Sequence, residues 1–437
     1  MPAAPFHLAW FLQGSSVQAW GEKWTGNISE DWMSCDMFLD LARGCERACF
    51  DYMLLEDSIY VGETWQNARD IYLKNGMSIP RQEPTVVATL MAAATTRLGI
   101  VQTLSTFAYA PYLTARIIGT LDQISGGRAG WNMVTGSSDL SAKNFGMEQL
   151  PPHDQRYDMA DEYIDICKQL WGSWEPGAIV ADRESGVLID PAKVRTIDYT
   201  GRYYSSRGPL NSGPCPQGQP VIAQAGGSDR GRRFAATHAD TIVAHVKGVE
   251  YMKDYRNDVR AKIAALGRDP DSCKVLFLIS PILAETDEEA QAKAAQREAS
   301  AAQNIDRRLA QIGWTSNIDF STFDLDQPVG ELTTNGHQQS LAQFLRKAGK
   351  RTLREAVISY TSGGASLDLV GSPDTVAAQM AEAMEEVGGD GFLFSMPNVT
   401  RRTTAEIADG LAPALQQRGL TRKAYAHKQL RDNLLEF

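Results

Sequence analysis

The alternation of short apolar runs with amphipathic segments is the feature that most constrains the fold of this chain. Each run is too short and too irregular for a helix, and the stretches between the early runs repeat apolar residues every three to four positions, as helices do. Such βαβ spacing is typical of a parallel α/β fold. The apolar runs occupy residues 6–12, 50–55, 98–104, 128–134, 220–225, 241–245, 274–283 and 391–395.

Eight strands with intervening helices predict an α/β fold of the (β/α)8 TIM-barrel type, in preference to an open doubly wound sheet. At 437 residues the chain exceeds a usual single domain, but a barrel with insertions accommodates that length. We expect one barrel domain over 1–437, with insertions after strands 4 and 7, at about 136–218 and 285–372. Residues 401–437 are expected to form a helical tail on the outside or at a subunit interface.

Three stretches stand apart from this pattern. The polar, Trp-rich residues 13–32 are expected to lie on a pocket rim. Residues 175–218 are rich in Gly, Pro and Tyr, which predicts short hairpins. Residues 313–350 lack clear periodicity and are interpreted as an insertion that acts as a lid.

Composition excludes several classes of partner. The net charge of −10 argues against nucleic acid or an anionic membrane, which require a basic face. No apolar run reaches the roughly 18–20 residues of a membrane span, and the N-terminus lacks the basic start of a signal peptide. The six cysteines are scattered without metal-ligand spacing, so we predict no metal site and reduced thiols in a cytoplasmic protein.

Small polar residues cluster at the expected carboxyl ends of the strands, where barrel enzymes hold their active sites. They suit a planar heterocycle with many donors and acceptors better than a hydrolytic site. The residues are Asp57, Thr103, Ser105, Asn132, Thr135 and Ser137. Asn132 has two interpretations, a buried amide satisfied by backbone or an amide aimed into a central pocket.

Two further segments have a structural and a functional interpretation. Gly226, Gly227 and Ser228 lie between a strand and a helix, so they form either a tight turn or a phosphate-binding loop. The segment His153-Asp154-Gln155-Arg156-Tyr157 opens a long amphipathic helix. It is either a capped first turn or a place where His153 and Tyr157 donate hydrogen bonds to an anion.

Together these segments resemble a known family. WN-x-VT at 131–135, HDQRY at 153–157 and QAGGSDRG at 224–231, at these separations, are similar to the bacterial-luciferase-like flavin monooxygenases. Within that family the chain resembles the branch of nitrilotriacetate monooxygenase component A, dibenzothiophene-sulfone monooxygenase and long-chain alkane monooxygenase. The resemblance covers nearly the whole chain and is weakest at 13–35, 59–82 and 305–350.

The resemblance implies a two-component monooxygenase that uses O2 and reduced FMN from a separate NAD(P)H:flavin reductase. It places the flavin ring and ribityl chain against Asp57, Thr103, Asn132, Thr135 and Ser137. The ribityl end and phosphate would lie against His153, Tyr157, Gly226, Gly227 and Ser228. It further implies catalytic roles for Asn132, Thr103 and His153, with His153 hydrogen-bonding near the flavin.

The substrate implied is a small organic compound, sulfur- or nitrogen-containing or a xenobiotic, and a homo-dimer or homo-tetramer is expected. A deazaflavin (F420)-dependent oxidoreductase on the same fold is the alternative. A hydrolase or a non-catalytic binding barrel is disfavoured by the missing metal-ligand spacing.

Overall fold

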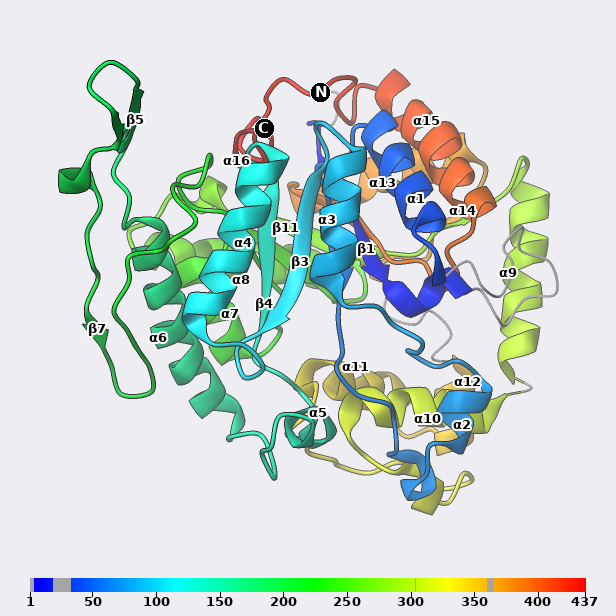
Figure 1. Cartoon of the computed structure of the whole chain (residues 1–437). Coiled ribbons are helices and arrows are strands. Elements are labelled where there is room, and N and C mark those ends of the chain that lie inside the picture. Colours follow the sequence, from blue (N-terminus) through cyan, green and yellow to red (C-terminus); the bar gives the residue numbers. More distant parts are fainter. Residues whose placement is uncertain (1–3, 19–32, 303, 360–364) are drawn as a thin grey trace.

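The computed structural model describes residues 4–18, 33–302, 304–359 and 365–437, so most of the rim stretch 13–32 lies outside the described residues. Eight parallel strands form a closed barrel in the order β1-β14-β11-β10-β9-β4-β3-β2 (Figure 1). This confirms the predicted barrel. The strands are β1 (His7–Gln13), β2 (Tyr52–Glu56), β3 (Gly99–Ser105), β4 (Ala129–Val134), β9 (Val221–Gln224), β10 (Thr241–Ala244), β11 (Lys274–Ile279) and β14 (Gly391–Phe394).

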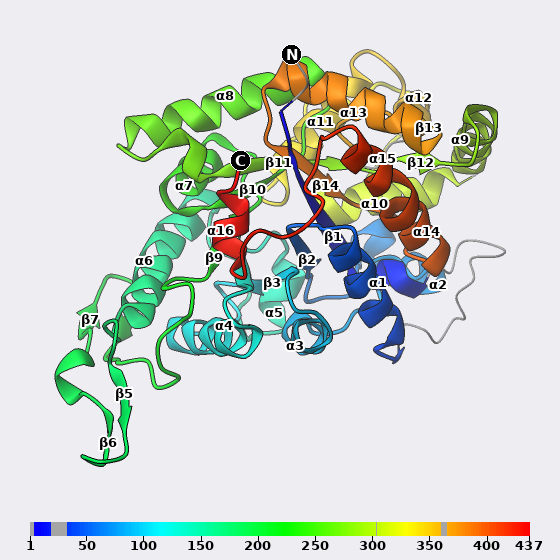
Figure 2. The ribbon, with the colours of Figure 1, turned by 90° about the horizontal axis from the view of Figure 1, so that it is seen from above.

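Helices surround the barrel and cover its outer face (Figure 2). Their apolar sides and the outward side chains of the strands form two large hydrophobic clusters. Local signals set the helix ends: Glu83 caps a helix that opens on Pro84, and Gly126 ends the next at a φ of 71°. The surrounding helices are α1 (Asp36–Arg47), α3 (Pro84–Ala94), α4 (Pro111–Ser125), α6 (His153–Trp171), α7 (Asp229–His238), α8 (Val249–Ala265) and α13 (Pro373–Val387).

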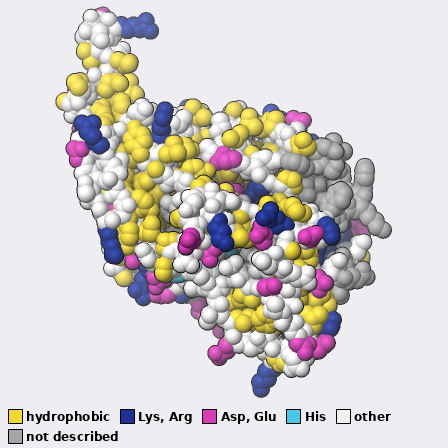
Figure 3. All heavy atoms as spheres, turned by 60° about the horizontal axis from the view of Figure 1, so that its bottom comes forward, with side chains coloured by type: hydrophobic (Ala, Val, Ile, Leu, Met, Phe, Trp, Pro, Cys, Tyr) yellow, Lys and Arg dark blue, Asp and Glu magenta, His cyan; other side chains and the backbone are white. Residues whose placement is uncertain are grey.

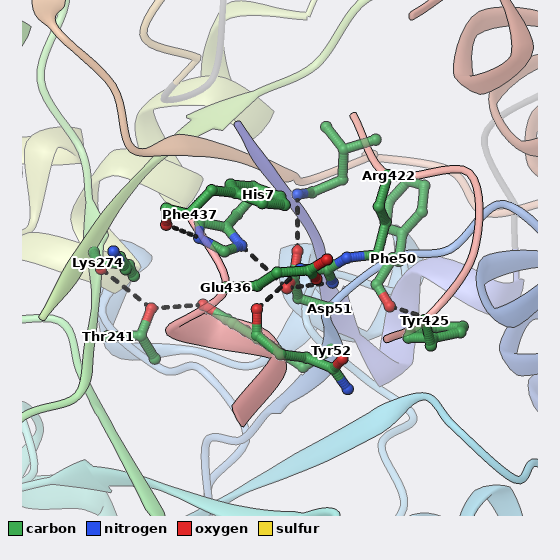
Figure 4. Close-up of polar contacts among 12 residues, drawn as sticks. His7, Phe50, Asp51, Tyr52, Thr241, Lys274, Arg422, Tyr425, Glu436 and Phe437 are labelled. Atoms are coloured by element: carbon green, nitrogen blue, oxygen red, sulfur yellow. Dashed lines mark hydrogen bonds and ion pairs between the residues drawn. The ribbon is translucent and has the colours of Figure 1, made fainter. Parts of the chain in front are cut away.

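The barrel interior is filled at its N-terminal end by the end of the chain. Inward side chains such as Val101 and Leu393 pack with Leu430 and Leu434 of α16 (Leu430–Leu434). Below them a polar cluster joins His7, Asp51 and Arg422 (Figure 4). The opposite, C-terminal end of the barrel is therefore the end at which a site can form.

A helical cap lies across the C-terminal end of the barrel, at the bottom of Figure 1. Its two sequence segments, roughly 60–77 and 305–357, share a hydrophobic cluster of their own that includes Trp65, Trp314 and Phe344. Such a core gives the cap a fixed internal structure. The cap helices are α2 (Asp70–Lys74), α10 (Ile305–Ser316), α11 (Gln338–Ala348) and α12 (Leu353–Ser359).

The insertion after β4 begins with α5 (Asp139–Lys143) and α6, and then leaves the body as an arm. The arm holds the predicted hairpins, formed by β5 (Ile179–Asp182) with β6 (Val187–Ile189) and by β7 (Tyr199–Thr200) with β8 (Ser205–Ser206). The insertion after β11 adds the two-stranded sheet of β12 (Ile282–Leu283) and β13 (Val370–Gly371), helix α9 (Asp287–Ala302) and most of the cap.

Two sequence-based expectations differ from the structure. Residues 313–350 contain a regular helix, α11, whose Leu341, Phe344 and Ala348 face the cap core. The tail is helical only in part: α14 (Arg401–Ala405), a π-helical turn (Glu406–Leu411) and α15 (Ala412–Gln417) are followed by irregular chain before α16. The irregular part runs along the N-terminal end of the barrel, which we call the barrel floor, and there Arg422 contacts Asp51. Tertiary contacts therefore determine its conformation.

Candidate functional site

The predicted site residues lie on neighbouring strands at the C-terminal end of the barrel. Asp57 follows β2, Thr103 belongs to β3, Asn132 belongs to β4, and Gly226–Ser228 follow β9. These four strands are adjacent in the order β2-β3-β4-β9. The barrel therefore gathers residues from distant parts of the sequence on one half of its mouth.

Thr103 and Asn132 form the best-defined contact of the site. They are paired in register on β3 and β4, and the Asn132 Nδ2 group donates to Thr103 Oγ1 at 2.8 Å. Their exposed fractions are 2% and 3%. Thr103 lies two residues beyond the inward-facing Val101 on β3, so its side chain also points into the barrel. Asn132 is paired with Thr103 on β4 and points the same way.

Two oxygen atoms beside this pair are buried without a hydrogen-bond partner among the described residues. They are Oδ1 of Asn132 and Oγ of Ser105, which lies two residues beyond Thr103 on the same face of β3. A buried oxygen without a partner costs free energy, because water no longer solvates it. The arrangement fits a ligand that presents N–H or O–H groups, and the backbone-satisfied interpretation of Asn132 is not what the structure shows.

The loop after β4 holds Thr135 and Ser137, both half-buried. Gly136 between them has a φ of 83°, and a Cβ there would lie 2.7 Å from the ring of Phe107. Ser138 then caps α5 by accepting from Leu140 N at 3.2 Å. These contacts at Gly136 and Ser138 restrict the conformation of the loop. Thr135 and Ser137 therefore lie at the end of β4, close in sequence to Asn132.

His153, Tyr157 and Ser228 come together where the N-termini of α6 and α7 meet. His153 Nε2 lies 3.4 Å from Ser228 Oγ, and the rings of His153 and Tyr157 are 5.2 Å apart between centroids. Ser228 Oγ also accepts from Gly231 N at 3.0 Å and so caps α7. The N-terminus of a helix favours anions, so this corner suits a phosphate group.

The glycine loop has the local role of a tight turn. The Gly226 N–H donates to Gln224 Oε1, and its carbonyl accepts from the Tyr255 hydroxyl at 2.8 Å. A Cβ on Gly226 would lie 2.6 Å from the carbonyl of Gly231, so only glycine fits there. Because its own polar groups are used inside the protein, Gly226 shapes the corner, while Gly227 and Ser228 border it.

Sequence analysis missed a charged group at the end of β2. Glu56 forms an ion pair with Arg81, whose side chain is buried. Burial, with the charges of Glu56 and Glu83, raises the pKa of Asp57 to about 7, against the opposing effect of Arg81. Asp57 therefore exchanges a proton near neutral pH. Glu56 directly follows the predicted strand 50–55, and this position at the mouth of the barrel could have identified it.

Two histidines were also missed. His245 directly follows β10 and continues the inward alternation of Thr241 and Val243. His337 directly precedes α11 of the cap. Burial, His337 and Lys247 lower the pKa of His245 to about 4, so its imidazole is neutral at pH 7. His245 lay at a predicted strand end, whereas His337 is brought in only by the folding of the cap.

Arg156, the arginine of the HDQRY segment, joins the cap to α6 beside the corner formed by His153, Tyr157 and Ser228. Arg156 is buried, and it donates to Pro151 O at 2.7 Å, to Asn335 Oδ1 at 3.3 Å and to Asn335 O at 3.2 Å. Asn335 lies two residues before His337. Arg156 therefore has a positioning role that sequence reasoning did not assign.

Among the described residues, no three His, Cys, Asp or Glu side chains are grouped so that they could hold a metal ion. In the same part of the chain, no helix is long and apolar enough to cross a membrane.

A closed parallel barrel with a polar mouth, an unpartnered amide and an anion-favouring helix corner fits the class of β/α-barrel enzymes that bind a ligand at the C-terminal end of their strands. Residues 13–391 match the luciferase-like monooxygenase family. The chain belongs to this family, which confirms the resemblance seen in the sequence, and it is an oxidoreductase of the monooxygenase type.

Individual relatives match over nearly the full chain. Dibenzothiophene-sulfone monooxygenase from Rhodococcus erythropolis (strain XP) is 34% identical, over 98% of this chain and 96% of the relative. Nitrilotriacetate monooxygenase component A from Aminobacter aminovorans is 30% identical, over 98% of this chain and 96% of the relative. The crystal structure of a riboflavin lyase with modified FMN and riboflavin has a TM-score of 0.89 at 31% identity, covering 99% of this chain and 96% of that one.

Proposed function

We propose that this chain is the oxygenase component of a two-component monooxygenase that binds reduced FMN delivered by a separate NAD(P)H:flavin reductase. The observation that carries the proposal is the buried Thr103–Asn132 pair, with Asn132 Oδ1 lacking a partner at the barrel mouth. The ring of reduced flavin carries N–H groups that match this acceptor and Ser105 Oγ. The name "component A" of one relative supports the two-component arrangement.

In this proposal each side chain has a defined task. Asn132 and Thr103 orient the flavin ring, and Asp57, Thr135 and Ser137 border it. Tyr157, His153, Ser228 and the turn at Gly226 and Gly227 hold the ribityl and phosphate end, where the α7 N-terminus favours negative charge. When bound, the reduced flavin supplies the electrons that activate O2, and the cap excludes water from the reacting atoms.

The substrate we propose is a small organic compound that contains sulfur or nitrogen, or a xenobiotic. The names of relatives that act on dibenzothiophene sulfone and nitrilotriacetate support this class. In the cap cluster the rings of Tyr60 and Trp314 stack at 5.7 Å, and aromatic side chains of this kind suit contact with an apolar or aromatic substrate. We further infer a cytoplasmic location from the six cysteines, which are all free thiols.

Rapid mixing tests the cofactor assignment. Reduced FMN is bound to the protein without oxygen, mixed with oxygenated buffer and followed by flavin absorbance. We expect the protein to bind reduced FMN and to delay its return to oxidised FMN relative to free solution. Failure of reduced FMN to bind would overturn the assignment, and reduced deazaflavin is then titrated as the alternative.

A second experiment tests the two-component arrangement. With NAD(P)H, FMN, O2 and a candidate substrate such as dibenzothiophene sulfone, oxygenated product is expected only after a flavin reductase is added. Product formed from NAD(P)H without any reductase would show that the chain reduces its own flavin, which contradicts this part of the proposal.

A further inference from the structure

A cavity of about 460 Å³ lies at the N-terminal end of the barrel, where α6, α7 and α16 meet (Figure 2). Lys168 lines it from the last turn of α6, His238 from the end of α7, and Arg431 from α16. Asp240 and Arg268, which follow α7 and α8, also line it. We call this cavity the α6–α7 pocket. It is separate from the barrel mouth, which lies at the other end of the strands.

Positive charge exceeds negative charge in the α6–α7 pocket. Its lining holds three cations (Lys168, Arg268, Arg431) and one carboxylate (Asp240), which gives a net charge of +2 with His238 counted as neutral. The whole chain carries −10, and on the face shown in Figure 3 basic and acidic side chains are interspersed. A concave surface with an excess of one sign concentrates ions of the opposite sign. The pocket therefore favours an anion, although the protein as a whole is acidic.

The two arginines of the pocket have partners within the protein. Arg431 Nη1 forms an ion pair with Asp240 Oδ1 at 2.6 Å. Arg268 donates to the carbonyls of Ala236 and Ala239 at 2.6 and 3.0 Å, at the end of α7, where the helix dipole favours a cation. Within the described ranges Arg268 has no carboxylate partner, so its charge is not neutralised by an ion pair.

Lys168 has neither kind of partner. Its ammonium donates to His238 Nδ1 at 3.1 Å and forms no ion pair with a carboxylate in the described part of the chain. Burial and the two arginines lower the pKa of Lys168, against the opposing effect of Asp240 and Asp165. An ammonium carries three N–H donors, so two of them remain for a ligand in the pocket.

Asp161 orients this lysine through His238. Asp161 Oδ1 lies 2.8 Å from His238 Nε2, which makes Nε2 the donor and leaves Nδ1 to accept from Lys168. Burial alone would raise the pKa of Asp161, but His238 and Arg230 hold it below its usual value. The carboxylate is therefore ionised, and the chain of contacts fixes the direction of the lysine. A side chain that is already ordered loses less entropy when it binds a ligand.

We propose that the α6–α7 pocket binds a phosphate group, either free or as the monoester of a small organic compound, with Lys168 and Arg268 as the cations that contact it. A phosphate monoester carries about −1.5 to −2 at pH 7, which balances the net charge of the pocket. The size of the cavity is in the range of small-molecule sites and leaves room beyond the phosphate itself. The acidic chain around it disfavours a long polyanion such as nucleic acid.

Protection of a single amine in the full chain tests the proposal. The protein is acetylated with a water-soluble N-hydroxysuccinimide ester, and modification of Lys168 is followed by peptide mass spectrometry with and without inorganic phosphate. Because a bound phosphate covers the Nζ group, labelling should slow by a factor of about 10 when phosphate is at about ten times its Kd. Sodium chloride at equal ionic strength should give no protection. Lys253, exposed on α8, is the matched control and should be labelled at the same rate throughout.

The same local measurement tests the second cation. Arg268→Met should raise the phosphate concentration that half-protects Lys168 by at least about 10-fold, because a charged donor is lost. Arg233→Met is its control, since Arg233 is exposed on α7 and pairs with Asp229, so half-protection should stay at the wild-type concentration. Arg268→Gln replaces the methionine variant if that variant does not fold.

Glycerol 3-phosphate distinguishes the two sources of the phosphate group. Protection at a lower concentration than inorganic phosphate identifies an ester, and equal or weaker protection identifies the free anion; both support the proposal. The proposal is overturned if Lys168 is labelled equally fast in phosphate and in chloride, since phosphate bound at the corner of His153 and Ser228 would not cover this amine. It is also overturned if Arg268→Met leaves half-protection unchanged. Labelling requires no flavin, so failure here is distinct from failure of the proposed function.

Discussion

Asn132 carries most of the argument for a ligand at the barrel mouth, so its removal is the first test at the scale of the residue. Asn132→Ala should leave the fold intact, because the change removes one hydrogen bond within the protein and no large volume. Loss of a buried hydrogen-bond partner is worth roughly 1–3 kcal/mol, which corresponds to roughly 5- to 150-fold weaker binding of reduced FMN. Anaerobic titration measures this.

Asn144→Ala provides the comparison for that variant. Asn144 is exposed at the end of α5 and donates to Ile59 O, so its loss should leave the titration unchanged. Wild-type affinity and turnover in Asn132→Ala would remove the role assigned to this amide.

Asp57 makes a prediction about pH and stability. Its pKa of about 7 exceeds the usual value of an aspartate, so the folded protein binds a proton here that the unfolded chain has already released. Stability conferred by this proton is therefore complete below the unfolded pKa near 4, and is lost as pH rises to 7. Asp57→Asn removes this dependence. The melting temperature of the variant minus that of wild type should therefore be larger at pH 8 than at pH 5.

Glu148→Gln on the surface is the control for this pH series. Thermal unfolding at the two pH values measures both variants. If the melting-temperature difference between Asp57→Asn and wild type is the same at pH 5 and pH 8, the shifted carboxyl is not responsible.

Single residues also show where sequence reasoning reached its limit. Thr103 and Asn132 could be placed together because both end strands of a parallel barrel, and such ends converge. His337 could not, because the long-range packing of α11 on the cap core brings it to the mouth. For Gly226 the sequence left two interpretations open. The contacts from Gln224 and Tyr255 now assign its polar groups to a turn.

At the scale of the element, periodicity located the barrel strands to within a few residues and most surrounding helices. Helix α8 could have been found as well, since Met252, Tyr255, Val259 and Ile263 recur every three to four residues. The irregular chain near Arg422 carries no local signal, because its conformation follows from contacts with the barrel floor. The same limit applies to the arm, whose hairpins were expected but whose projection depends on the whole molecule.

The cap and α6 are joined through Arg156, and this joint makes a prediction. Arg156→Met keeps the length and apolar stem of the side chain but removes the three hydrogen bonds to Pro151 and Asn335. Only the two longer bonds to Asn335 reach the cap, and together they are worth about one hydrogen bond from a charged donor, roughly 1.5–3 kcal/mol. Amide exchange over 331–348 should therefore become faster by roughly 10- to 100-fold, while the barrel strands keep their protection.

Arg307→Met tests whether loss of any cap arginine has this effect. Arg307 belongs to α10 of the same cap and its side chain is exposed. Unchanged exchange is expected for it. Equal exchange in Arg156→Met and wild type would mean that the cap core alone holds this segment in place.

At the scale of the whole molecule, the N-terminal end of the barrel is closed by an interaction between the two ends of the described chain. His7 Nδ1 and Arg422 Nη1 contact Asp51 Oδ1 at 2.9 and 2.5 Å, and Leu8 N donates to Asp51 Oδ2 at 3.1 Å (Figure 4). The ring of Phe437 stacks on His7 at 4.5 Å. Burial alone would raise the pKa of Asp51, but His7 and Arg422 hold it below its usual value.

Arg422→Met should therefore be among the most destabilising substitutions of a buried residue in this chain. It leaves the Asp51 carboxylate buried without one of its two basic partners, which costs roughly 3–5 kcal/mol. Arg418→Met removes a partly exposed arginine that lies 3.5 Å from Asp374, and should cost no more than about 1 kcal/mol. Urea unfolding at pH 7 measures both.

The same cluster predicts how acid affects the protein. Because the folded pKa of Asp51 lies below the unfolded one, its contribution to stability is present above the unfolded value near 4 and disappears as pH falls through the folded value. Asp51→Asn should be less stable than wild type at pH 7, and the difference should shrink as the pH falls below 4. A difference that stays constant across this range would show that shape, rather than charge, makes Asp51 important, and that the ends of the chain close the barrel by packing alone.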